Sequence, residues 1–119
     1  MVDNTENNKR LVVLGGGESG VGAAILAKDK GMDVFLSDSG SVAPRYAAML
    51  DAEGIEWEQG HHTMERILSA DEIVKSPGIP PASPVMKAIA GRGIPVISEI
   101  ELAGRYTDAK MVGITGSNG

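Results

Sequence analysis

Residues 11–26 read Leu-Val-Val-Leu-Gly-Gly-Gly-Glu-Ser-Gly-Val-Gly-Ala-Ala-Ile-Leu, and this stretch decides the fold. Four consecutive aliphatic residues are typical of a parallel strand that is covered on both faces. The turn that follows contains the pattern G-x-G-x-x-G at Gly15, Gly17 and Gly20, and an apolar helix comes directly after it. The stretch therefore predicts a buried strand, a glycine turn and the first turns of a helix.

Each glycine of this turn has its own physical role. Gly15 allows the tight turn out of the strand, Gly17 lets a phosphate approach the backbone, and Gly20 lets the helix pack close to the strand. The helix N-terminus offers unpaired N–H groups and a positive dipole end to an anion. The carboxylate of Glu18 would repel such a ligand, whereas the hydroxyl of Ser19 could either donate to it or cap the helix. We favour a phosphate-binding turn, with a purely structural turn as the alternative.

Composition limits the possible classes of protein. The 119 residues suffice for one domain, and with 42% hydrophobic but only 3% aromatic residues the core must be aliphatic. A net charge of −5 argues against a general nucleic-acid binder. The chain has no cysteine, no apolar run of the roughly 20 residues that span a bilayer, and no signal-peptide pattern at its start. We expect a cytoplasmic protein without membrane insertion.

Strand and helix patterns alternate along the chain. We expect strands at residues 9–14, 32–37, 55–59, 72–75, 94–97 and 110–115, and helices at residues 19–30, 44–53, 64–69, 83–90 and 98–106. Ser83 precedes Pro84 as an expected N-cap, and Ser98 with Glu101 forms a capping-box pattern. The alternation predicts an α/β fold, an open doubly wound parallel sheet of Rossmann-like type in a single domain. Residues 1–8 are expected to be a flexible arm.

Ligands of such sheets bind beyond the carboxyl ends of the strands, where three stretches of this sequence fall. They are the glycine turn, residues 38–40 and residues 76–79. Asp38 could bind a ribose or be an exposed turn residue, and we favour the ligand role. Gly78 could present its amide to a phosphate or simply follow the end of a strand. His61 and His62 are assigned a solvated or capping role, because no third ligand completes a metal set.

The last residues, 113–119, read Gly-Ile-Thr-Gly-Ser-Asn-Gly. An apolar strand that runs into a second glycine-rich loop is the beginning of a P-loop, whose lysine and Ser/Thr would come next. We therefore interpret the sequence as a piece cut at a domain junction, with residues 9–108 as one domain and 109–119 as the start of another. We expect residues 110–119 to lie outside the first sheet, disordered or paired with a second copy of the chain.

Four stretches together resemble the N-terminal domain of the Mur ligases, the ATP-dependent amide-bond ligases of peptidoglycan synthesis. They are Val-Val-Leu-Gly-Gly-Gly-Glu-Ser-Gly at 12–20, Asp-Glu-Ile-Val-Lys-Ser-Pro-Gly-Ile-Pro at 71–80, Ser-Glu-Ile-Glu-Leu at 98–102, and residues 113–119. The glycine loop alone is unspecific, but this order of motifs is specific. It favours the branch of the family that adds D-glutamate to UDP-N-acetylmuramoyl-L-alanine.

The resemblance implies a domain that binds the UDP end of that substrate. Substrate contacts are implied at Gly17, Glu18, Ser19, Gly20, Asp38, Ser39 and Gly78. The loop would hold the diphosphate, Asp38 and Ser39 the uridine, and Gly78 would line the same cleft. Two positions depart from the family: Glu18 is charged where an apolar residue is frequent, and Gly40 stands where some members have an arginine.

For the full-length protein the resemblance implies ATP and Mg²⁺, which activate the substrate carboxylate as an acyl phosphate for attack by D-glutamate. An incomplete ATP-binding loop is implied at Thr115, Gly116, Ser117, Asn118 and Gly119. Catalytic residues are expected beyond the end of this sequence, so the 119 residues alone should be inactive. The alternative is an NAD-binding domain of an oxidoreductase or regulatory protein. That alternative shares the glycine turn and Asp38 but explains neither residues 76–80 nor the second glycine loop.

Overall fold

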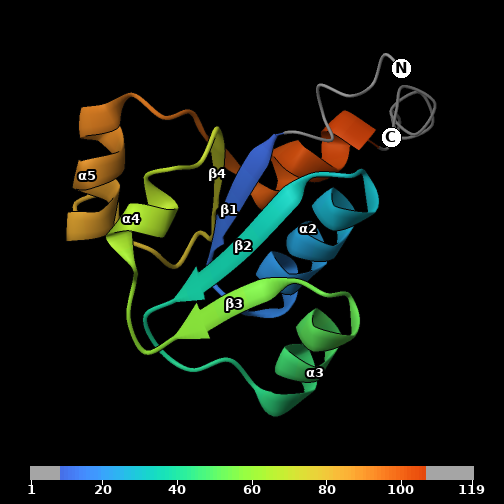
Figure 1. Ribbon diagram of the computed structural model, residues 1–119. Coiled ribbons are helices and arrows are strands. Elements are labelled where there is room, and N and C mark those ends of the chain that lie inside the picture. Colours follow the sequence, from blue (N-terminus) through green and yellow to red (C-terminus); the bar gives the residue numbers. More distant parts are fainter. Residues whose placement is uncertain (1–8, 107–119) are drawn as a thin grey trace, which may run out of the picture.

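Strands and helices alternate throughout residues 9–106, which are the part of the chain that the computed structural model describes (Figure 1). In chain order the elements are β1 (Arg10–Leu14), α2 (Glu18–Asp29), β2 (Asp33–Asp38), α3 (Pro44–Ala52), β3 (Glu56–Gln59), α4 (Met64–Ile67), β4 (Glu72–Lys75), α5 (Pro84–Arg92) and β5 (Val96–Ser98). A last helix follows at residues 99–106. The predicted arm at 1–8 and the predicted strand at 110–115 lie outside the described residues.

The sheet is parallel throughout, with the strand order β3-β2-β1-β4-β5. In Figure 1, α2, α3 and the helix at residues 99–106 cover one face, while α4 and α5 cover the other. This arrangement confirms the predicted open, doubly wound sheet. The chain runs outward from β1 to β3 and then returns to the other side of β1 at β4. The order of the sheet thus reverses between β1 and β4, where such folds bind ligands.

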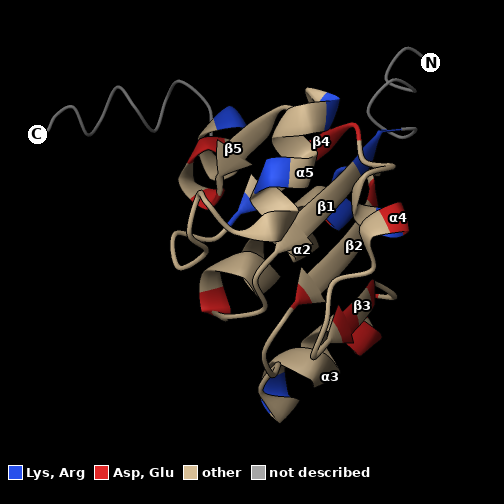
Figure 2. Ribbon diagram, turned by 90° about the vertical axis from the view of Figure 1, so that its left-hand side faces the viewer, with Lys and Arg blue, Asp and Glu red and all other residues tan. Residues whose placement is uncertain are grey.

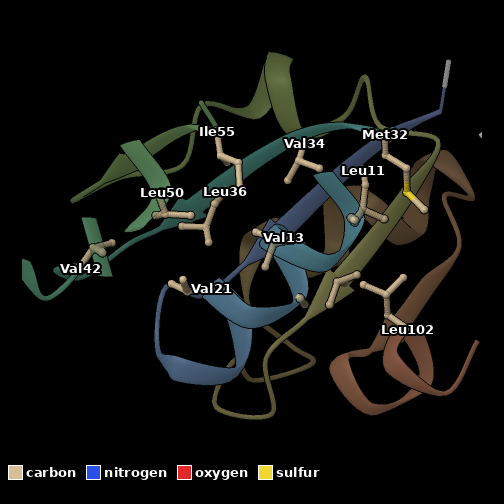
Figure 3. Packing of buried hydrophobic residues seen from close by; sticks show 14 residues of the cluster. Leu11, Val13, Val21, Met32, Val34, Leu36, Val42, Leu50, Ile55 and Leu102 are labelled. Atoms are coloured by element: carbon tan, nitrogen blue, oxygen red, sulfur yellow. The ribbon is translucent and has the colours of Figure 1, made fainter. Parts of the chain in front are cut away.

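Strand β1 is the centre of the core because both of its faces are buried. Leu11 and Val13 point into a cluster with α2, α3 and the last helix, part of which Figure 3 shows. Val12 and Leu14 point into a second cluster with α4 and α5. All four side chains are fully buried. A continuous aliphatic run at residues 11–14 is what a strand between two helical layers requires.

At Gly20, helix α2 lies directly against the turn that follows β1. A Cβ atom at this position would lie 2.0 Å from the carbonyl oxygen of Gly15, far closer than any real contact. Only a residue without a side chain allows this approach, as the sequence predicts. The helix is therefore fixed with its N-terminus at the carboxyl end of β1.

The element boundaries agree with the predicted ones to within about two residues, and the exceptions have local causes. Helix α2 begins at Glu18 with Gly17 as N-cap, so the predicted alternative of a capping role for Ser19 is wrong. Ser83 is the N-cap of α5 by position, but its side chain makes no capping hydrogen bond. Strand β5 begins only after Pro95, which has no N–H to donate to a ladder.

The capping box at the last helix is confirmed in both directions. The Glu101 N–H donates to Ser98 Oγ at 3.0 Å, and the Ser98 N–H donates to Glu101 Oε1 at 3.3 Å. Among the described helices, none is long and apolar enough to cross a membrane.

An ion cluster joins the last helix to the amino end of the sheet. Glu72 is 5% exposed and accepts two hydrogen bonds from the Arg105 guanidinium, at 3.0 and 2.9 Å. The Lys9 Nζ lies 2.8 Å from the same carboxylate. Hydrogen bonds from Arg105 and the charge of Lys9 outweigh burial and hold the pKa of Glu72 below its ordinary value. This cluster lies at the opposite end of β4 from the switch point and is structural.

Exchanging single glycines of α2 tests the close packing. Gly20→Ala should lower the free energy of unfolding by about 1–3 kcal/mol, because the new methyl group collides with backbone that cannot move aside. Gly22→Ala is the matched control, since a Cβ there meets nothing within 4 Å. It should raise stability by roughly 0.5–1 kcal/mol through helix propensity. Urea denaturation of both variants measures the difference, and equal effects would contradict the packing argument.

A pH series tests the ion cluster. The folded-state pKa of Glu72 is depressed, so its stabilising contribution is present above its ordinary value of 4.5 and is lost as pH falls through the folded-state value. Glu72→Gln should therefore cost about 1–3 kcal/mol near neutral pH. The difference from wild type should shrink in acid. Denaturant titrations at several pH values measure it, and a difference independent of pH would refute the assignment.

Candidate functional site

Four loops at the carboxyl edge of the sheet line a cavity of about 340 Å³. We call this cavity the switch-point cleft; its lining residues are Gly15, Gly16, Gly17, Asp38, Ser39, Gly40, His62, Ser76, Gly78 and Ile79. The three stretches that the sequence predicted to lie at the carboxyl ends of the strands are thus brought together. His62 is a fourth contribution, from the loop between β3 and α4.

The floor of the cleft is the turn after β1. Gly15 has φ +113°, a conformation that L-residues rarely adopt, and its N–H donates to the Ser37 carbonyl at 2.9 Å. A Cβ at Gly15 would lie 2.6 Å from Ser76 Cβ, so the turn and the loop after β4 are in contact. By contrast, a Cβ at Gly17 would meet nothing within 4 Å, and Gly17 is exposed. The backbone of Gly17 is therefore open to a ligand in the cleft.

Asp38 fixes the wall of the cleft through two backbone amides. The Gly16 N–H donates to Asp38 Oδ2 at 2.7 Å, and the Gly40 N–H donates to Asp38 Oδ1 at 2.7 Å. Both carboxylate oxygens are therefore engaged in holding the glycine turn against the turn after β2. Since each oxygen can accept more than one hydrogen bond, this bracing leaves room for a ligand donor as well.

The residues predicted at the start of α2 do not all face the cleft. Glu18 and Ser19 are exposed in the first turn, and Ser19 lines a second cavity of about 420 Å³ beside Glu99 and Ile100. The charge of Glu18 lies at the positive end of the helix dipole, which explains a carboxylate here in structural terms. Gly20 is buried beneath the turn. Of the four residues at 17–20 with an expected ligand role, Gly17 alone lines the switch-point cleft, together with the expected residues Asp38, Ser39 and Gly78 from other loops.

Another cavity, more apolar and of about 360 Å³, adjoins the switch-point cleft. It shares Ser39, His62, Gly78 and Ile79 with the cleft, and its other lining residues are Met64, Pro80, Ser83, Pro84 and Val85. We call it the apolar pocket. A polar cleft with backbone amides beside an apolar pocket suits a ligand with an anionic part and a flat, weakly polar part.

Sequence reasoning missed a polar network behind His62. Ser37 is fully buried, and its hydroxyl contacts Glu58 Oε2 at 2.7 Å and His62 Nδ1 at 2.7 Å. Glu58 also accepts hydrogen bonds from the Thr63 N–H and hydroxyl and contacts His61 Nε2 at 2.9 Å. The expectation of a solvated or capping His62 is therefore wrong. The one available signal was Ser37 itself, a polar residue in an otherwise apolar buried run.

The pKa values of this network follow from its contacts. Burial acts to raise the pKa of Glu58, but hydrogen bonds from Thr63 and Ser37 outweigh it and leave the pKa below its ordinary value. Burial also lowers the pKa of His62, and the nearby carboxylates of Glu58 and Asp38 offset this only in part. Near neutral pH, Glu58 is therefore ionised and His62 is neutral.

The charge distribution agrees with a small ligand rather than a polyanion. Figure 2 shows the Lys and Arg positions of the described ribbon spread over separate elements and interspersed with Asp and Glu. No group of three or more His, Asp or Glu side chains suited to hold a metal ion occurs among residues 9–106. No Lys or Arg from the described part of the chain lines the switch-point cleft, so the groups there that could bind an anion are the backbone amides at the glycine turn.

Fold and cleft together define a class, that of Rossmann-like ligand-binding domains with a glycine turn at the topological switch point. Within this class, residues 9–98 match the family model "Mur ligase MurD-like, N-terminal domain". The chain belongs to this family.

Individual relatives agree with the family. The chain is 62% identical over 111 residues to the UDP-N-acetylmuramoylalanine–D-glutamate ligase of Bacteroides fragilis, covering 93% of this chain and 25% of that protein. It is 58% identical over 109 residues to the ligase of the same name from Porphyromonas gingivalis, covering 92% and 24%. A murein peptide ligase from Psychrobacter arcticus has the same fold, with a TM-score of 0.74 at 20% identity over 83% of this chain and 21% of that one. The chain thus spans about a quarter of the length of these ligases.

Replacing Asp38 by Asn tests the brace of the cleft. One amide oxygen can serve only one of the two N–H groups well, so stability should fall by about 1–3 kcal/mol. Hydrogen exchange at Gly16 or Gly40 should also become faster. Urea denaturation and NMR exchange measure these effects. Asp29→Asn, at an exposed position at the end of α2, is the control and should change stability by less than about 0.5 kcal/mol. Unchanged exchange at both glycines would contradict the brace.

Proposed function

We propose that the chain is the UDP-substrate-binding N-terminal domain of an ATP-dependent ligase that adds D-glutamate to UDP-N-acetylmuramoyl-L-alanine in peptidoglycan synthesis. The observation that carries the proposal is the switch-point cleft, with an open backbone at Gly17, in a chain 62% identical to a ligase of that name. The family match and the relatives do not favour the alternative of an NAD-binding domain.

In this proposal the glycine turn holds the diphosphate. Phosphate oxygens would accept hydrogen bonds from the amides of Gly17, Glu18 and Ser19 at the N-terminus of α2, where no side chain caps the helix. The Ser19 hydroxyl would add a donor from the side of the helix. Gly20 contributes indirectly, because its packing against Gly15 positions those amides.

The uridine would lie toward the turn after β2. Asp38 would accept hydrogen bonds from the uridine, and Ser39 would donate to it. Gly78 would allow close approach from the loop after β4, because a Cβ there would meet open space. The absence of a side chain at Gly40 leaves the end of this site open, where some relatives in the family have an arginine. The role of these residues is to bind and orient the substrate. The chemistry itself takes place elsewhere.

The remainder of the reaction would belong to residues outside the described part. ATP with Mg²⁺ would supply the activation of the substrate carboxylate, and the loop that binds ATP would begin with Thr115, Gly116, Ser117, Asn118 and Gly119. Residues 9–108 would be the substrate-binding domain and residues 109–119 the start of the ATP-binding domain, in a cytoplasmic enzyme. We expect residues 1–119 alone to bind substrate without turning it over, and residues 110–115 to be able to pair with a second copy.

Calorimetry with residues 1–119 tests the ligand class. UDP-N-acetylmuramoyl-L-alanine should bind and NAD should give no comparable signal. Gly17→Val should abolish binding of the UDP substrate, because the side chain occupies the space that the phosphates need. Gly91→Val, at an exposed position of α5 where a Cβ also meets nothing within 4 Å, is the matched control and should bind like wild type. Tight binding of NAD, or a Gly17→Val variant that binds normally, would overturn the proposal.

A further inference from the structure

Ser37, Glu58, His62 and Thr63 form a hydrogen-bonded network, which we call the Ser37 network. The direction of its hydrogen bonds follows from the charge of Glu58. Its carboxylate accepts from the Thr63 N–H at 2.6 Å and the Thr63 hydroxyl at 2.5 Å and contacts His61 Nε2 at 2.9 Å. An ionised carboxylate is an acceptor only. The single proton of the Ser37 hydroxyl must therefore point to Glu58 Oε2, which lies 2.7 Å away. The weaker contact to the His61 carbonyl, at 3.3 Å, does not compete with this charged acceptor.

This direction fixes the tautomer of His62. With its proton on Glu58, the Ser37 oxygen can only accept from His62 Nδ1, 2.7 Å away. Nδ1 then carries the proton of the neutral imidazole, and Nε2 is left with a lone pair. His61 Nε2 lies 2.9 Å from Glu58 Oε1, on the other side of the same carboxylate. The tautomer of His62 is therefore set through Ser37 alone.

The ring of His62 belongs to a residue that borders ligand space. His62 lines both the switch-point cleft and the apolar pocket, so its ring stands where the two meet. Nε2 makes no hydrogen bond to the described residues. Among the described residues, the buried side-chain atoms that lack a partner are Ser83 Oγ and Glu99 Oε2. His62 Nε2 lacks a partner and is not one of them, so it must be accessible to solvent. The half-buried ring thus carries one accessible acceptor, in a residue that lines both cavities.

We propose that His62 is a specificity-determining residue, whose Nε2 accepts a hydrogen bond from an N–H or O–H donor of the nucleoside part of the ligand. A neutral donor fits better than a phosphate, because the lone pair and the carboxylates of Asp38 and Glu58 repel an anion. Three donors of the uridine in UDP have this chemistry: the imide N–H of the base and the 2′ and 3′ hydroxyls of the ribose. The identity of the nucleoside in this inference rests on the proposed function. The tautomer of His62 does not depend on it.

A ligand-free experiment tests the state of His62 alone. In an imidazole ¹⁵N NMR spectrum of the full chain near neutral pH, His62 should show a protonated Nδ1 and an unprotonated Nε2. In Ser37→Ala the His62 signals should move toward a mixture of tautomers, because the acceptor for Nδ1 is gone. A protonated Nε2 at His62 in wild type would overturn the assignment whatever the domain binds.

Calorimetry with UDP as the probe tests the role in recognition. His62→Asn keeps an N–H near the position of Nδ1 for Ser37 but removes the acceptor at Nε2, and should raise the Kd for UDP about three- to tenfold. His62→Gln, whose amide oxygen can reach the Nε2 position, should restore part of the affinity. Wild-type affinity in His62→Asn would overturn the proposal.

Ligand variants locate the donor by double-mutant cycles. N3-methyl-UDP lacks the imide donor, and the 2′-deoxy and 3′-deoxy forms each lack one hydroxyl. The donor that pairs with His62 is the one whose removal weakens binding to wild type but not to His62→Asn. Coupling with any of the three supports the proposal and names the group. Loss in His62→Asn without coupling to any of them would indicate a phosphate contact and overturn it. If wild type binds no UDP, the proposed function and the nucleoside assignment fail together, and the NMR result still decides the state of His62.

Discussion

The approach of α2 to the end of β1 is the constraint on which the rest of the structure depends. With a Cβ at Gly20 excluded by the Gly15 carbonyl oxygen, helix and strand meet with no space between them. The positive φ of Gly15 then directs the turn toward Ser76, and Asp38 fastens the next residue, Gly16, to the neighbouring turn. The floor of the cleft is therefore built from backbone held at short range, and the Asp38 side chain fixes the adjoining wall.

The fold follows from the sequence because its signals are local and repeated. The aliphatic run at residues 11–14, the regular alternation of strands and helices, and the capping box at Ser98 each predict one element or boundary, and together they predict the sheet. The meeting of three loops also follows, since the carboxyl ends of parallel strands share one edge. Within residues 9–106, the errors in the predicted elements were limited to their ends. At Pro95 a missing N–H delays the strand, and Gly17 takes the capping position that was one of two alternatives for Ser19.

The network behind His62 could not be predicted, because it depends on sheet register. Ser37 pairs with Glu58 across β2 and β3, and the turn after β3 then brings His62 back over Ser37. None of these separations has a sequence signature. The same reason explains why the bracing role of Asp38 was not predicted beside its ligand and turn alternatives: its bonds to Gly16 and Gly40 depend on how two turns face each other. Polar residues at the site therefore have a structural role that precedes any ligand.

The central claim is that the switch-point cleft binds the UDP end of the substrate, and mapping of backbone amide shifts tests it most directly. In a titration of the isotope-labelled chain with UDP-N-acetylmuramoyl-L-alanine, the largest changes should fall on Gly16, Gly17, Ser39 and Gly78. Amides beside Glu72, at the opposite edge of the sheet, should stay unchanged. Changes that gather at that opposite edge, or no changes at saturating substrate, would contradict the account.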